Sequence, residues 1–149
     1  MQRAAFFAVF ALCAVSGRAS VLDALSRSDV RVSTHLREID SSAVGALTRQ
    51  FHDRDRRLAD HGAPFEATDA LGPENHPQRR LVLATHVGDT WFIHYEHGGF
   101  GYHSHLVALT RVGNSWRVEY TAAAFHVYDS LAKLRAAIRG HQFQKTYEL

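Results

Sequence analysis

The sequence predicts an α+β protein with one or more N-terminal helices, a four-stranded antiparallel meander, and a C-terminal helix packed on the sheet. Two observations support this fold class. Between residues 81 and 122, four apolar runs alternate with short glycine-containing turns, which is the pattern of successive β-hairpins. On both sides of this region, apolar residues recur three and four positions apart, as they do along one face of a helix.

The first residues have the composition of a targeting signal. Arg3 precedes the unbroken apolar run Ala4–Val15, and the small residues Gly17 and Ala19 stand just before the expected cleavage point. We therefore expect a signal peptide over residues 1–19 and a single α+β domain over residues 20–149. The mature protein is then expected to be exported, either to a periplasm or out of the cell.

Removal of this segment changes the charge balance. The chain has 17 Lys and Arg against 15 Asp and Glu, and Arg3 and Arg18 leave with the signal, so the mature net charge is about zero. This balance argues against nucleic acid or an anionic membrane surface as a partner. The single cysteine, Cys13, also leaves, so the domain must be held by its core and not by disulfides. No later segment approaches membrane-spanning length.

Two helices are predicted before the sheet. The first is short and covers Val21–Ser28. The second begins with a serine N-cap at Ser41–Ser42 and ends before Gly62, which is followed closely by a proline. Its apolar face consists of Val44, Leu47, Phe51 and Leu58. The proline-containing segment Ala63–Arg80 is then a long connection, which is typical of a functional or mobile loop.

The meander and the last helix follow from turn chemistry. Gly88-Asp89 and Gly113-Asn114 are two-residue turns, and Gly98–Gly101 is a glycine-rich reversal. The predicted strands are Leu81–Val87, Thr90–His97, Tyr102–Val112 and Ser115–Ala122. The C-terminal helix covers Ser130–Arg139, with a cap at Asp129 or Ser130 and a stop at Gly140.

The turn lengths allow the faces of the sheet to be estimated. We expect Glu96 opposite His103 and His94 opposite His105 across the glycine-rich reversal. Because side chains alternate along a strand, these four residues then share one face and His97 lies on the other. Both faces carry large apolar residues, so the sheet is either covered on both sides or offers one face for binding.

One hypothesis from this arrangement is a transition-metal site. His103 and His105 form a His-X-His pair on one side of a strand, and His94 from the neighbouring strand completes a set of three nitrogens. Zinc, copper and nickel accept such a set, with Glu96 as a fourth ligand or as an orienting group. The alternative is that these histidines pack against aromatic residues at the surface.

Two further hypotheses concern proton chemistry. Glu96 with His94 or His103 could act as a general acid and base. The chain has no Gly-X-Ser-X-Gly, catalytic cysteine or His-Glu-X-X-His motif, so we lean against an enzyme. The 11 histidines would make the mature chain cationic below about pH 6, which suggests a pH response.

The function that the sequence favours is a small exported binding protein, similar in architecture to inhibitor or immunity modules. Exposed aromatic residues on a sheet are typical of protein-binding surfaces. The residues expected to form this surface are Trp91, Tyr95, Phe100 and Tyr102. This hypothesis requires a protein partner and no cofactor, whereas the alternative requires zinc or another transition metal.

Overall fold

A computed structural model describes residues 24–25, 30–52, 55–68, 75–99, 101–146 and 149. The predicted signal peptide lies outside the described residues, as does most of the predicted helix Val21–Ser28. Within the described part of the chain, no helix is long and apolar enough to cross a membrane.

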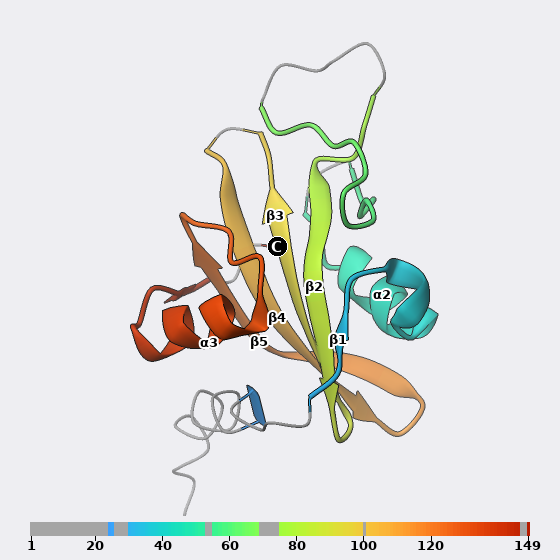
Figure 1. Cartoon of the computed structure of the whole chain (residues 1–149). Coiled ribbons are helices and arrows are strands. Elements are labelled where there is room, and N and C mark those ends of the chain that lie inside the picture. Colours follow the sequence, from blue (N-terminus) through green and yellow to red (C-terminus); the bar gives the residue numbers. More distant parts are fainter. Residues whose placement is uncertain (1–23, 26–29, 53–54, 69–74, 100, 147–148) are drawn as a thin grey trace, which may run out of the picture.

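In the described part of the chain, the architecture is a six-stranded antiparallel sheet with helix α2 on one face and helix α3 on the other (Figure 1). The strands follow one another in chain order: β1 Val32–Ser33, β2 Arg79–Val87, β3 Thr90–His97, β4 His103–Val112, β5 Ser115–Ala124 and β6 Gln144–Lys145. The prediction of four strands is therefore wrong. The four long strands occur as consecutive hairpins, but β1 and β6 add an edge strand on either side. Each has only two residues, too few to show an alternating pattern, and is defined by its distant partner.

The helix that begins at Ser41 is shorter than predicted. Helix α2 covers Ser41–Thr48, and its N-cap is Asp40, whose carboxylate accepts a hydrogen bond from the Ser42 N–H at 2.8 Å. A 3-10 turn, η1, precedes it at Leu36–Glu38. Phe51 and Leu58, the last residues of the predicted apolar face, are still buried. Ala59 hydrogen-bonds to the main chain of β2, so the chain is extended there and not helical. Pairing with the sheet therefore outweighs the helical pattern there.

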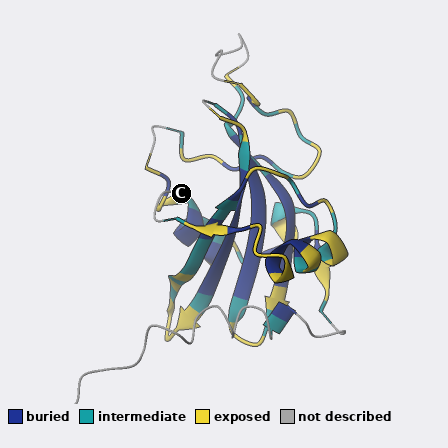
Figure 2. Cartoon of the chain, turned by 90° about the vertical axis from the view of Figure 1, so that its left-hand side faces the viewer, coloured by how far each residue is buried: buried dark blue, intermediate teal, exposed yellow. Residues whose placement is uncertain are grey.

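The C-terminal helix is confirmed. Helix α3 covers Leu131–Arg139, the Ser130 hydroxyl caps it by accepting from the Lys133 N–H, and Gly140 ends it. It packs on the face of the sheet that carries Phe92 and Leu106. Helix α2 packs on the opposite face. Both faces are therefore covered, and Figure 2 shows the central strands as the most buried part of the protein.

The register between β3 and β4 differs from the prediction by one residue. His97 lies opposite His103 and Tyr95 opposite His105, so that five residues form the reversal. Gly99 and Gly101 have φ angles of 91° and 90°, which glycine adopts without strain. A shift of one residue moves every side chain of β3 to the other face relative to β4. The expected pairs Glu96–His103 and His94–His105 are thereby replaced.

Candidate metal centre

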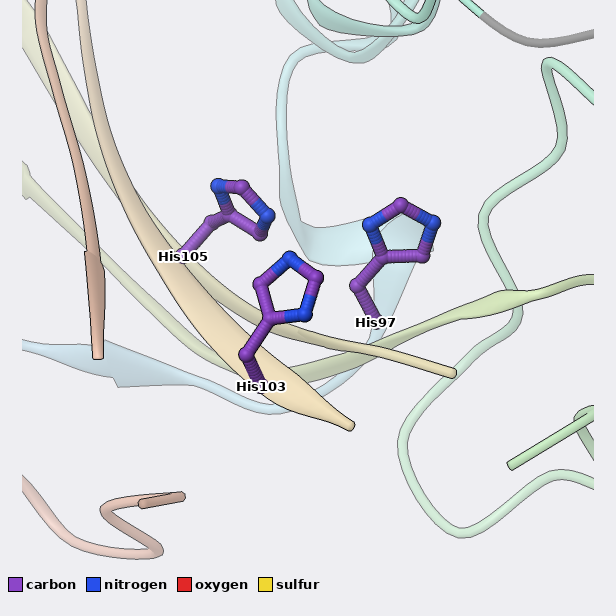
Figure 3. Close-up of side chains that lie close together, drawn as sticks. All are labelled: His97, His103 and His105. Carbon is purple, nitrogen blue, oxygen red and sulfur yellow. The ribbon is translucent and has the colours of Figure 1, made fainter. Parts of the chain in front are cut away.

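Three histidines gather on one side of the β3–β4 hairpin. His97 comes from the end of β3, and His103 and His105 come from the start of β4 (Figure 3). One ring nitrogen of each lies within 4.8 Å of one ring nitrogen of the other two. The group lies at the turn end of β3 and β4, on the face that carries Tyr95 and is covered by α2.

His105 is the buried member of this group. It is 3% exposed, and among the described residues neither of its ring nitrogens has a hydrogen-bond partner. Its ring stacks on Tyr95 with centroids 5.0 Å apart and an interplanar angle of 14°. Burial lowers the pKa of His105 to about 3, with a further contribution from the neighbouring histidines. The imidazole is therefore neutral at pH 7 and carries a nitrogen lone pair that can bind a metal ion.

His103 is oriented by a hydrogen bond of its own. Its Nδ1 lies 2.5 Å from the main-chain oxygen of Gly101, to which it donates. This bond places the ring proton on Nδ1 and leaves the lone pair on Nε2. Metal-binding histidines commonly donate their second nitrogen to a main-chain carbonyl in this way. His103 thus has the tautomer and the support expected of a ligand.

His97 completes the set from the opposite strand. It is partly buried, and its ring centroid lies 5.0 Å from that of His103 and 5.7 Å from that of His105. Zinc–nitrogen bonds of about 2.1 Å require nitrogens about 3.4 Å apart in a tetrahedral site. The ligand nitrogens must therefore close by up to about 1.4 Å when a metal ion binds.

His94, which the sequence predicts as a ligand, lies on the opposite face. It is fully buried; its Nδ1 donates to the main-chain oxygen of His105 at 2.8 Å, and its Nε2 accepts from the Tyr128 N–H at 3.2 Å. Burial lowers its pKa to about 4. Both ring nitrogens are used, so His94 ties β3 and β4 to the segment before α3.

Glu96 is also directed away from the three histidines. Its carboxylate accepts from the Arg80 Nε at 2.6 Å and from the Tyr102 hydroxyl. Burial, followed by the hydrogen bond to Glu96, raises the pKa of Tyr102 to about 12. Arg80 also donates to the Ala63 carbonyl and lies over the Phe65 ring, so the cluster fastens the long connection to the sheet. The structure does not bring Glu96 together with His103 for acid–base chemistry.

The residues predicted as a protein-binding surface do not form one exposed patch. Tyr95 is completely buried and Trp91 is 8% exposed, both in the core under α2. Tyr102 is 42% exposed, and Phe100 lies outside the described residues. The aromatic composition of β3 therefore reflects a strand covered on both faces.

The residue that sequence reasoning missed is His97. The length of the reversal is the signal that could have found it. With five turn residues, His97 pairs with His103 and both side chains lie on one face. No family model, curated protein or solved structure matches this chain. The assignment of the site therefore depends on its own geometry.

Proposed function

We propose that this is an exported protein that binds a transition-metal ion, with zinc as the reference ion, through His97, His103 and His105. The observation that carries the proposal is His105, whose two ring nitrogens are buried without a hydrogen-bond partner among the described residues. A buried polar atom without a partner costs about 1–3 kcal/mol, so such a group normally has a role or a ligand. A bound metal ion supplies a partner for one of these two nitrogens.

The neighbouring histidines support this explanation. Three imidazoles from two antiparallel strands converge, with one nitrogen of each within 4.8 Å of the others, and one is held in the tautomer that exposes Nε2. The donor set is entirely nitrogen, which suits zinc, copper or nickel better than calcium or magnesium. The predicted ligands His103 and His105 remain in the proposal, whereas His97 takes the place of His94 and Glu96.

The partner-binding hypothesis stays a prediction. Two of its four residues are buried, and no other observation in the described part of the chain identifies a partner surface. Export also remains a proposal that depends on residues 1–19. The mass of the mature protein tests it directly, since cleavage after Ala19 must leave Ser20 as the first residue.

The test of metal binding uses untagged protein, zinc titration and thermal unfolding. We expect about one zinc per chain, and zinc at 100 times its dissociation constant should stabilise the fold by about 2.7 kcal/mol. His103→Ala should weaken zinc binding at least about 100-fold, because the protein loses a direct ligand. His61→Ala is the matched control, because this histidine is exposed on a turn and is not one of the three converging residues.

Two results would contradict the proposal. One is the absence of both zinc binding and a thermal shift in the wild-type protein. The other is an equal loss of zinc affinity in the His103→Ala and His61→Ala variants, which would indicate nonspecific binding by surface histidines. Titrations with copper and nickel then rank the three ions at the same site.

A further inference from the structure

The proposed metal centre has a ligand count that bears on its chemistry. Among the described residues, the group contains three histidines and no fourth His, Cys, Asp or Glu. Structural zinc sites normally have four protein ligands, whereas catalytic zinc sites have three and keep the fourth position for water or substrate. The described ligands therefore correspond to a site with one open position.

A cavity adjoins one of these histidines, His103. His103 lines a space of about 210 Å³ together with the end of β5, Ala123–Phe125, and residues between Gln142 and Thr146. Ala123 lies opposite His105 in the β4–β5 register, so its side chain is on the face that carries the metal centre. At about 30 Å³ per water, the cavity has room for about seven waters or one small organic molecule.

The lining of this cavity restricts the chemistry of its occupant. Phe125 is 81% exposed and offers an apolar edge, while Gln142, Gln144 and Thr146 offer hydrogen-bonding groups. Among the described lining residues, Lys145 is basic and none is a carboxylate. The cavity therefore suits a small neutral molecule, or one that becomes an anion when hydroxide adds to it.

From these observations we infer that the site is hydrolytic, and that its substrate is a small carbonyl compound open to attack by hydroxide, such as carbon dioxide or a short acyl ester. This inference rests on the proposed metal function. Zinc held there would lower the pKa of a coordinated water to about 7 and so make hydroxide available at neutral pH. The cavity beside His103 would hold the carbonyl carbon next to the open position.

The reaction balances with water alone. Hydroxide from a water molecule forms a C–O bond with the carbonyl carbon, and the released proton passes to solvent. With carbon dioxide the product is bicarbonate. With an ester, the bond from the carbonyl carbon to the alkoxy oxygen breaks, the alcohol leaves with one proton, and a carboxylate remains. No redox partner is needed in either case.

The experiment compares metal-free, zinc-loaded and cobalt-loaded full-length protein. With 4-nitrophenyl acetate and with carbon dioxide as separate substrates, the zinc protein should be at least tenfold faster than the same concentration of free zinc for one or both of them. Azide should change the visible spectrum of the cobalt protein, because an open position accepts an anion. This spectroscopic measurement is independent of activity.

A variant pair tests the role of the cavity. Thr146→Phe should fill it and lower the rate at least fivefold with zinc affinity unchanged, because Thr146 lines the cavity and lies outside β3 and β4, which carry the proposed ligands. Ala132→Phe on the exposed side of α3 should leave both unchanged. Zinc binding with no rate above free zinc, or a cobalt spectrum that is insensitive to azide, would overturn the hydrolytic inference and leave metal binding intact. Failure of the protein to bind zinc would overturn both.

Discussion

At the scale of single residues, two buried histidines of the sheet, His94 and His105, have different roles. His94 and His105 are both buried histidines on neighbouring strands, and burial lowers the pKa of both. His94 uses both nitrogens in hydrogen bonds, whereas His105 uses neither among the described residues. The pattern of hydrogen bonding, and not burial alone, separates a structural histidine from a candidate ligand.

Glu96 offers a residue-scale prediction. Glu96→Gln should lower the free energy of unfolding by about 1–3 kcal/mol, because it removes the charge from the hydrogen bonds with Arg80 and Tyr102. Zinc affinity should change by less than about threefold, because this carboxylate faces away from the three histidines. Chemical denaturation and zinc titration of the same sample measure the two effects. A loss of affinity like that of His103→Ala would restore Glu96 as a ligand.

At the scale of elements, the β3–β4 reversal controls the composition of the site. Gly98 is buried, its N–H donates to the Gln78 carbonyl at 2.8 Å, and its Cα faces the main chain of Glu66. The reversal is thus packed against the long connection before β2. The observed five-residue turn places His97, His103 and His105 on one face.

Two glycine variants should therefore have opposite effects. A Cβ at position 98 would lie 1.8 Å from the Glu66 carbonyl oxygen, so Gly98→Ala should destabilise the protein by at least about 2 kcal/mol. Gly45→Ala should stabilise it by about 0.5–1 kcal/mol, because Gly45 lies inside α2 and its added Cβ meets only the flexible end of Arg49. Denaturant titration of both variants measures the difference. Equal effects would contradict the packing described for Gly98.

At the scale of the whole molecule, α2 and α3 cover opposite faces of the sheet. Buried polar side chains, His94, Glu96 and His105, lie near the β3–β4 reversal. The apolar side chains gather in two clusters, one under α2 and one under α3. Both buried histidines lie in this covered sheet, one on each face. Their protonation is consequently linked to global unfolding.

The stability of the metal-free protein should fall between pH 6.5 and pH 5. The pKa values of His94 and His105 are about 4 and about 3 in the folded protein but near 6.5 when unfolded, so only the unfolded chain takes up these protons as the pH falls below 6.5. Each group contributes a slope of up to about 1.4 kcal/mol per pH unit. The slope fades above about pH 7.5, where the unfolded histidines are also neutral.

Denaturation with a chelator present, at several pH values in this range, measures the slope. His94→Asn should reduce it by about half, because one of the two groups is removed. The exposed His61 provides the control, since His61→Ala should leave the slope unchanged. An unchanged slope in His94→Asn would contradict the assignment of His94 as a buried neutral group.

The sequence by itself determined the α+β class, the four long strands, the two-residue turns and the C-terminal helix. These features depend on local periodicity and on turn chemistry at Gly88, Gly113 and Gly140. The extent of α2 and the two edge strands depend on pairing between distant segments, which local patterns do not encode. The sequence also placed His103 and His105 on one face, because residues two apart on a strand always share it.

Only the tertiary structure decided which residue joins those two histidines. The choice between His94 and His97 depends on whether the reversal has an even or an odd number of residues, since one position changes the face. Gly98, the first residue of the reversal, packs against the connection before β2, which is a contact between segments far apart in the chain. Coverage by α2 likewise buried Trp91 and Tyr95, which local sequence could not distinguish from exposed aromatic residues.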